Sequence, residues 1–298
     1  MKIVAIVQAR LGSKRLPNKV IKKIDGSPMI EILLKRLSQS KLITKIVVAT
    51  STDSKDNKLK LLVNKLGYEC EQGSIDNVLN RYICVAEKYE ADIVVRITGD
   101  CPLVDPEIVD EVINKFKEDS VDYCSNTNPP TFPDGLDVEV FTLEALKKSS
   151  SMTTNDSDLE HVTPYLKESG NFKTSSLENK VDLSEMRWTV DESLDFEVIS
   201  AIFNNFSPNV NFSWIKVLGL QQSSPDIFKN SSLIRNDGFS MGDGQKLWKR
   251  AKQIIPGGNM LLSKRPEMFL PDLWPSYFSK SKGCMVWDLD GKKYIDMS

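Results

Sequence analysis

An apolar run passes directly into a basic loop near the start of the chain, in the stretch Lys2-Ile3-Val4-Ala5-Ile6-Val7-Gln8-Ala9-Arg10-Leu11-Gly12-Ser13-Lys14-Arg15-Leu16-Pro17-Asn18-Lys19. A short run that is apolar at successive positions is typical of a parallel strand buried on both faces of a sheet. Open α/β sheets bind ligands beyond the carboxyl ends of their strands, which is where this loop begins. The stretch therefore predicts an α/β fold with a binding site in its first strand-to-helix loop.

The composition of the loop favours a phosphate ligand. Glycine lets the backbone approach a ligand closely, and cationic side chains form charge-assisted hydrogen bonds to phosphate oxygens. The loop contains neither the Walker pattern nor the G-x-G-x-x-G pattern of dinucleotide sites. A solvated basic loop is the alternative, but the position next to the first strand favours a nucleoside triphosphate. The residues that lead to this hypothesis are Arg10, Gly12, Ser13, Lys14, Arg15 and Lys19.

Overall composition limits the partners and the compartment. The 298-residue chain has a net charge of −2, so we expect neither nucleic acid nor an acidic membrane as a partner. No apolar run approaches the ~20 residues that span a bilayer, and we find no signal-peptide pattern. Five scattered cysteines form no C-x-x-C pair, which argues against a disulfide framework and a zinc site. We expect a cytoplasmic protein.

Short strand patterns alternate with amphipathic helix patterns through the first two thirds of the chain. This alternation predicts an α/β fold, a three-layer sandwich with a mostly parallel sheet. Strands are expected at Ile3–Val7, Lys45–Ala49, Asp92–Ile97 and Val138–Phe141. Helices are expected at Met29–Ser38, Asp56–Leu66, Asp76–Lys88 and Glu107–Phe116.

The composition changes after about residue 218, which predicts a boundary. We expect a first domain over residues 1–220, a linker rich in Ser, Asn, Asp and Gly over 221–244, and a further segment over 245–298. That last segment shows a helix pattern and three short strand patterns, with Asp290-Gly291 as a hairpin turn. So few elements bury too little surface for a self-sufficient domain. The helix and strand patterns lie at Gln245–Ile255, Tyr277–Ser279, Met285–Asp288 and Lys293–Ile295.

Two aspartates are candidate magnesium ligands. Asp100 follows the apolar strand in Val94–Pro106, and Asp191 follows a second strand-like run that begins at Arg187. Magnesium favours one or two carboxylates together with substrate phosphates and water. The alternative is that each aspartate is a turn residue or a helix cap, which we expect of Asp105 before its proline.

Polar groups elsewhere are candidates for substrate contacts. The proline-rich loop before Val138 offers Asp134 and Asp137 to an acceptor's hydroxyls. His161, the only histidine, is a candidate base or substrate contact, although a single histidine is as often structural. Ser74 stands where a helix pattern begins and could contact a nucleoside. Cys101 has no histidine nearby in sequence, so a thiol nucleophile is a weak hypothesis.

Taken together, these motifs resemble the cytidylyltransferases that activate acidic sugars, including the 3-deoxy-manno-octulosonate and acylneuraminate enzymes. The nearest resemblance is to the spore coat polysaccharide biosynthesis protein F (SpsF) family, over residues 1 to about 220. The matching motifs are Gln8-Ala9-Arg10 with Arg15-Leu16-Pro17 and Lys19, Gly73-Ser74 with Asp76 and Arg81-Tyr82, Arg96-Ile97-Thr98-Gly99-Asp100-Cys101-Pro102, Phe132–Glu139, Glu160–Tyr165 and Arg187–Asp191.

The resemblance implies a single displacement, in which an acceptor oxygen attacks the α-phosphate of CTP and pyrophosphate leaves. It implies that Asp100 and Asp191 bind Mg²⁺ and that Arg10, Lys19 and Asp100 are catalytic. The expected nucleotide-binding residues are Gln8, Ala9, Arg10, Gly12, Ser13, Arg15, Lys19 and Ser74. The expected substrate residues are Arg96, Asp134, Asp137, Glu160 and His161. The expected partners are CTP and a small acidic-sugar or similar acceptor, and a homodimer stays open. Gln8-Ala9-Arg10-Leu11-Gly12-Ser13 departs from the Pro-Ala-Arg-Gly-Gly-Ser of sialic-acid relatives, which weakens a nonulosonate assignment.

The last segment resembles the N-terminal part of class III pyridoxal-phosphate aminotransferases, close to glutamate-1-semialdehyde aminomutase. The matching residues lie in Leu247–Gly258, Lys282–Asp288 and Asp290–Asp296. The Schiff-base lysine of that family lies further along its chain than this segment reaches. We therefore expect the front of a bifunctional fusion, without pyridoxal phosphate or transamination in the chain as given.

Two other functions stay open. A GT-A-type glycosyltransferase would share the α/β crevice, but it usually needs an Asp-x-Asp pair, whereas Asp100-Cys101-Pro102 has none. A non-catalytic nucleotide-binding module fused to an aminotransferase is the third hypothesis. Pyrophosphate release from CTP distinguishes the leading hypothesis from both.

Overall fold

The computed structural model describes residues 1–13, 15–228, 243–255, 277–289 and 291–295. The chain divides into two compact units, Met1–Arg235 and Asn236–Ser298. The two units are described separately below.

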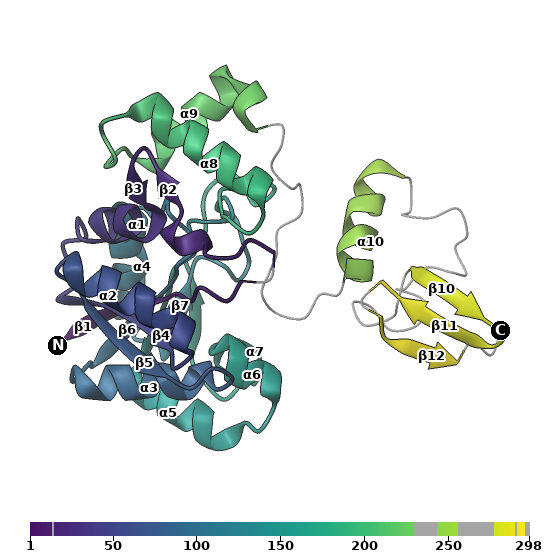
Figure 1. The fold of residues 1–298 in the computed structure, drawn as a ribbon. Helices are drawn as coiled ribbons and strands as arrows, with labels where there is room; N and C mark the ends of the chain where they lie inside the picture. Colours follow the sequence, from purple (N-terminus) through teal and green to yellow (C-terminus); the bar gives the residue numbers. More distant parts are fainter. Residues whose placement is uncertain (14, 229–242, 256–276, 290, 296–298) are drawn as a thin grey trace. The chain divides into compact units, whose positions relative to one another are not determined.

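A seven-stranded sheet forms the centre of the first unit (Figure 1). Its strand order is β5-β4-β1-β6-β8-β7-β9. The first four strands in this order are parallel, β8 runs antiparallel to β6, and β7 pairs antiparallel with β8 and parallel with β9. The strands are β1 (Ile3–Gln8), β4 (Lys45–Ser51), β5 (Glu69–Gly73), β6 (Ile93–Thr98), β7 (Tyr123–Ser125), β8 (Glu139–Thr142) and β9 (Thr174–Ser176).

Helices cover both faces of this sheet, so the predicted three-layer α/β sandwich is confirmed (Figure 1). Side chains of β1 alternate between two apolar clusters: Ile3 and Val7 join one, and Val4 and Ile6 join the other. The first cluster takes side chains from α1 (Met29–Leu37), α2 (Asn57–Lys65), α4 (Pro106–Asp119), α8 (Ser193–Phe206) and α9 (Trp214–Ser223). The second takes side chains from α3 (Val78–Lys88), α5 (Leu143–Met152) and α7 (Pro164–Glu168), with α6 (Asp156–His161) next to them in the chain.

The predicted strands and helices of residues 1–120 form close to their expected positions. Three details of the first unit differ from the predictions. Helix α3 begins at Val78 with Asn77 as its N-cap, so Ser74 lies before the helix. The expected strand at residues 187–190 is wrong, because only a single bridge forms there, between Arg187 and Asp134. The apolar core also continues past residue 220, since Phe228 is buried in the first cluster. The start of the expected linker therefore belongs to the first unit, and residues 229–242 lie outside the described residues.

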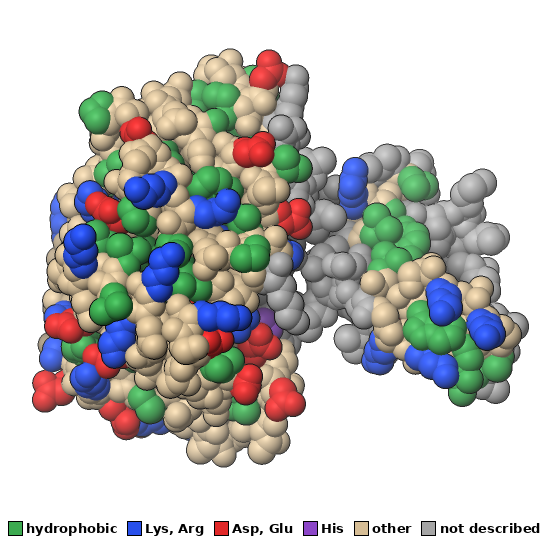
Figure 2. All heavy atoms as spheres, viewed as in Figure 1, with side chains coloured by type: hydrophobic (Ala, Val, Ile, Leu, Met, Phe, Trp, Pro, Cys, Tyr) green, Lys and Arg blue, Asp and Glu red, His purple; other side chains and the backbone are tan. Residues whose placement is uncertain are grey.

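The second unit contains the predicted helix, as α10 (Asp243–Ile254), and a three-stranded antiparallel sheet. Lys280 and Lys293 both lie over the ring of Trp287, and Figure 2 shows basic side chains gathered around hydrophobic ones on this unit. The strands are β10 (Phe278–Lys282), β11 (Met285–Asp288) and β12 (Lys293–Ile295). Strands β11 and β12 pair as the hairpin that the sequence predicts. The aminotransferase resemblance stays a prediction.

No helix in the described parts of either unit is long and apolar enough to cross a membrane.

Candidate active site

The site lies at the edge of the sheet where the parallel strands end. Gly99 brings the ends of β1 and β6 together, because its N–H donates to the carbonyl of Gln8 at 2.8 Å. A Cβ at Gly99 would lie 2.9 Å from the Cβ of Ala9, closer than real side chains approach. Glycine is therefore required where the basic loop passes the Gly-Asp turn.

A buried carboxylate anchors the start of the basic loop. Asp56 accepts the N–H of Leu11 at 2.7 Å, and its other oxygen accepts the backbone N–H and the hydroxyl of Ser51. Leu11 and Leu16 are buried, whereas Arg10 and Arg15 are exposed on the same loop. Buried apolar side chains and one carboxylate thus hold the loop backbone, while Arg10 and Arg15 remain accessible to solvent.

Asp56→Ala is expected to lower the free energy of unfolding by about 1–3 kcal/mol, because it leaves buried donors without an acceptor. It is also expected to raise the dissociation constant of CTP, because the loop backbone loses its anchor. Chemical denaturation and calorimetric titration with CTP measure the two effects. Asp53→Ala is the matched control. Asp53 caps the short 3-10 helix Ser54–Asp56 by accepting the Lys55 N–H, and its replacement should leave CTP binding unchanged. Equal CTP affinity in both variants would exclude Asp56 as an anchor.

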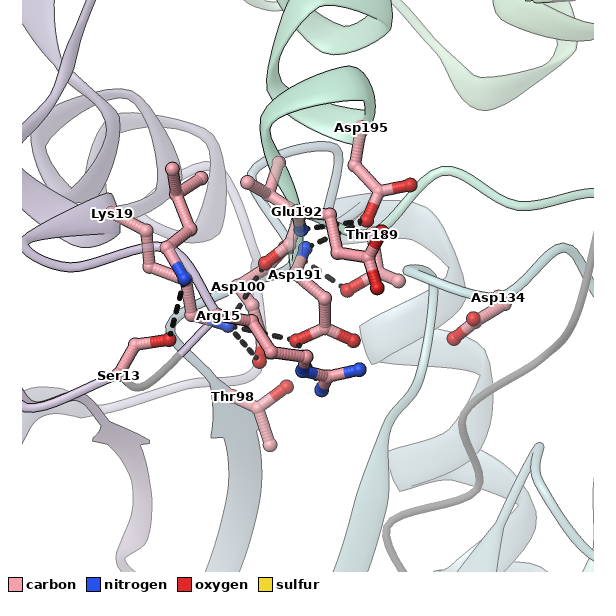
Figure 3. A network of polar contacts seen from close by, with 12 residues as sticks. Ser13, Arg15, Lys19, Thr98, Asp100, Asp134, Thr189, Asp191, Glu192 and Asp195 are labelled. Carbon is pink, nitrogen blue, oxygen red and sulfur yellow. Dashed lines mark hydrogen bonds and ion pairs between the residues drawn. The ribbon is translucent and has the colours of Figure 1, made fainter. Parts of the chain in front are cut away.

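Lys19 joins the two aspartates that the sequence analysis singles out (Figure 3). Its Nζ lies 2.9 Å from Oδ2 of Asp100 and 3.0 Å from Oδ1 of Asp191, and it donates to the carbonyl of Val190 at 2.8 Å. Arg15 lies 3.2 Å from the same oxygen of Asp191. Arg15, Lys19, Asp100 and Asp191 are therefore one cluster.

Electrostatics keep this cluster ionised. Burial alone would lower the pKa of Lys19, but Asp100 and Asp191 more than offset it, and the pKa is raised. Burial alone would raise the pKa of each aspartate, yet Lys19 holds the pKa of Asp100 below its ordinary value. Lys19, Arg15 and Arg187 together hold the pKa of Asp191 well below its ordinary value. At neutral pH the cluster contains two carboxylates and their cations.

Arg187 pairs with one member of this cluster, Asp191, and with two further aspartates. Its guanidinium lies 2.8 Å from Asp134, 3.0 Å from Oδ2 of Asp191 and 3.0 Å from Asp195. Asp195 also accepts the backbone N–H groups of Asp191 and Glu192 at the start of α8. The buried ion network therefore fixes the carboxylate of Asp191, and it places Asp134 in a structural contact that the sequence analysis did not predict.

A second polar group gathers on the α3 and α5 side of the sheet. Glu139 is buried and pairs with Arg96 and, at 3.3 Å, with Lys167. Burial raises the pKa of Glu139, but these cations more than offset it, so the carboxyl is ionised. Arg96 also donates to the side chain of Gln8 at 3.4 Å. Burial is the main cause of the lowered pKa of His161, and the positive charges of Arg96 and Lys167 lower it further. The imidazole is therefore neutral near pH 7.

The remaining predicted residues lie around these two groups. Ser74 is exposed just after β5, at the same carboxyl edge as the basic loop. The hydroxyl of Ser13 accepts the N–H of Leu16 at 3.3 Å, so it helps to shape its own loop. Glu160 is exposed and Asp137 is half-buried. Gly12 is exposed in the loop, and Lys14 lies outside the described residues.

Cys101 is buried beside Asp100, and burial raises the pKa of its thiol well above the ordinary value. A protonated, buried thiol is a poor nucleophile. Sequence reasoning missed the roles of Asp56, Arg187 and Asp195. The sequence did contain one sign of this network. Arg187, Asp191 and Asp195 follow one another at intervals of four residues, with opposite charges close enough in the chain to pair.

The two predicted metal ligands are of the type that magnesium prefers, and their carboxylates approach the same point. The Lys19 ammonium lies at that point, 2.9 Å from Asp100 and 3.0 Å from Asp191, and the side chain of Asp100 is 28% exposed. Among the described residues, no group of three or more His, Cys, Asp or Glu side chains is arranged to hold a metal ion. Two carboxylates suffice where substrate phosphates and water complete the shell, as magnesium sites at phosphates commonly do.

A cationic loop and paired carboxylates at the carboxyl edge of a mostly parallel sheet define a nucleotidyltransferase-type α/β enzyme. The cytidylyltransferase family model matches residues 4–212, and the chain belongs to this family.

Relatives and solved structures agree with this assignment. An uncharacterized protein of Methanocaldococcus jannaschii is 36% identical over 80% of this chain and 98% of its own length. The spore coat polysaccharide biosynthesis protein SpsF of Bacillus subtilis is 31% identical over 75% of this chain and 95% of its own. The structure of a cytidylyltransferase from Leptospira borgpetersenii has a TM-score of 0.75 and 31% identity, over 78% of this chain and 98% of that one. The SpsF-like resemblance predicted from the motifs is confirmed.

Proposed function

We propose that the first unit transfers CMP from CTP to an acidic sugar or a related acceptor, with release of pyrophosphate, in the synthesis of a surface polysaccharide precursor. Family membership supports the nucleotide, and the SpsF relative supports the polysaccharide role. One observation carries the chemistry: Lys19 and Arg15, from the basic loop, meet Asp100 and Asp191 at one point. This juxtaposition supports a triphosphate site next to two carboxylates.

The reaction forms one bond and breaks one. An acceptor oxygen attacks the α-phosphorus of CTP, its proton passes to solvent or a nearby base, and the bond to the pyrophosphate oxygen breaks. Arg10, Arg15 and Lys19 neutralise charge on the triphosphate and orient it. Such transfers depend on positioning and charge neutralisation rather than on a covalent intermediate, which agrees with the protonated state of Cys101.

Asp100 and Asp191 are proposed to hold Mg²⁺, which would neutralise charge on the phosphates when bound. The ion network of Arg187 keeps Asp191 in place for this role.

Arg96 and His161 are proposed to contact the acceptor. The Nε of Arg96 is buried and has no hydrogen-bond partner among the residues that the structure describes. Arg96 and Lys167 both pair with the carboxylate of Glu139. The two cations are groups that could bind the carboxylate of an acidic sugar.

The direct test is pyrophosphate release from CTP with Mg²⁺ and a panel of acidic sugars. Release that depends on CTP and on one acceptor supports the proposal. Transfer from a nucleotide sugar would instead support a glycosyltransferase, and no release with any nucleoside triphosphate would support a binding module.

Arg15→Ala is expected to weaken CTP binding by about 1.5–3 kcal/mol, the range for a hydrogen bond to a charged group. The side chain is 49% exposed and pairs with Asp191 at 3.2 Å, so the fold should be unaffected. Calorimetric titration measures the CTP dissociation constant. Lys2→Ala removes a cation at the opposite end of β1 and serves as the control. An unaltered dissociation constant in Arg15→Ala would remove this residue from the binding site.

A further inference from the structure

The Lys19 ammonium occupies the point on which the two proposed metal ligands converge (Figure 3). An ammonium group has three N–H donors. The three acceptors at 2.8–3.0 Å, on Asp100, Asp191 and Val190, use all of them. The Lys19 side chain is only 11% exposed, so this cation is enclosed within the cluster.

We propose that Lys19 is an internal counter-ion that excludes a divalent metal from Asp100 and Asp191 until a bound triphosphate draws its ammonium away. This inference rests on the proposed function, and it adds that metal and nucleotide binding are coupled through one side chain.

Electrostatics and geometry both support exclusion. A divalent ion between the carboxylates would stand within a few ångströms of the ammonium, and like charges at that separation repel strongly in a partly buried site. The lysine side chain is flexible, and Lys19 lies at the end of the basic loop. The phosphate oxygens of a bound triphosphate would therefore offer its ammonium new acceptors. Asp191 would stay in position after Lys19 moves, because Arg187 holds its other oxygen at 3.0 Å.

Coupling of this kind is reciprocal. If a triphosphate raises the affinity for the metal, the metal raises the affinity for the triphosphate by the same factor. The arrangement would keep the free protein from holding a metal without nucleotide.

Mn²⁺ binding to the full chain tests the proposal, with electron paramagnetic resonance to count free ion and α,β-methylene-CTP as a non-reacting nucleotide. Affinity of the nucleotide for Mn²⁺ alone is measured and subtracted. Without nucleotide, Lys19→Met is expected to bind Mn²⁺ at least about tenfold more tightly than wild type, because the competing cation is gone. With nucleotide, wild type should gain at least about tenfold in Mn²⁺ affinity, and Lys19→Met should gain much less.

Two further variants keep the test decisive. Lys19→Arg retains the charge and should still exclude Mn²⁺, which separates charge from packing if Lys19→Met folds poorly. Lys23→Met, on the exposed side of β2 (Lys23–Ile24), should behave as wild type. Equal Mn²⁺ affinity of wild type and Lys19→Met without nucleotide would overturn the proposal while CTP binding still supported the enzyme. If wild type bound neither α,β-methylene-CTP nor Mn²⁺, the proposed function itself would fail.

Discussion

Asp100→Asn is expected to lower kcat for the proposed CMP transfer on the order of 100- to 1,000-fold, because it removes a charge that we propose holds the metal at the reacting phosphate. The Asp100 carboxylate is the more exposed of the pair at Lys19, and asparagine has nearly the same shape. The fold should therefore persist. Pyrophosphate release at saturating CTP measures kcat, and circular dichroism checks the fold.

Asp92→Asn is the matched control for this experiment. Asp92 immediately precedes β6 and Asp100 follows closely after it, so the two aspartates lie at opposite ends of the same strand. Asp92 accepts the N–H of Lys2 and is exposed, and its replacement should leave kcat unchanged. If Asp100→Asn kept wild-type kcat, the assignment of this carboxylate to the reaction would be wrong.

Arg187→Met is expected to lower the free energy of unfolding by about 3–5 kcal/mol at pH 7, because it leaves buried carboxylates without their cation. Arg187 contacts Asp134, Asp191 and Asp195, and all four residues are buried. Urea denaturation measures the loss. Lys35→Met removes the exposed cation of an i,i+4 pair with Glu31 on α1 and should cost at most about 0.5 kcal/mol. A loss as small as that of the control would show that the network does not stabilise the fold.

The pH dependence gives this prediction a second readout. Burial raises the pKa of Asp191 and of Glu139, but neighbouring cations more than offset it and hold both values low. Their stabilising contribution is thus fully present above the unfolded-state values near 4, and it is lost as the pH falls through the lower folded-state values. In Arg187→Met the deficit relative to wild type should shrink with falling pH, since a protonated carboxyl needs no guanidinium.

Much of the fold follows from local sequence patterns. The apolar run at β1 and the amphipathic helices after it predict a parallel sheet between two helix layers, and each helix face follows from residues a few positions apart. The short strands β7 and β9 could not be predicted in this way, because three residues are too few to show an alternation of apolar and polar side chains. The expected strand before Asp191 failed for a related reason. Its apolar residues pack in the core, but its backbone finds only one partner, at Asp134.

The candidate site, like the fold, was predictable from the sequence only in part. The sequence by itself determined which side chains form the candidate site of this protein: a basic loop after the first strand, and an aspartate after each of two apolar runs. Only the tertiary structure decided that Lys19 lies between aspartates 81 and 172 positions away, and that Asp56 and Arg187 hold the loop and the carboxylate. The physical reason is range. Hydrophobic periodicity and turn preferences act between near neighbours, whereas contacts among these charges depend on the order and register of strands far apart in the chain.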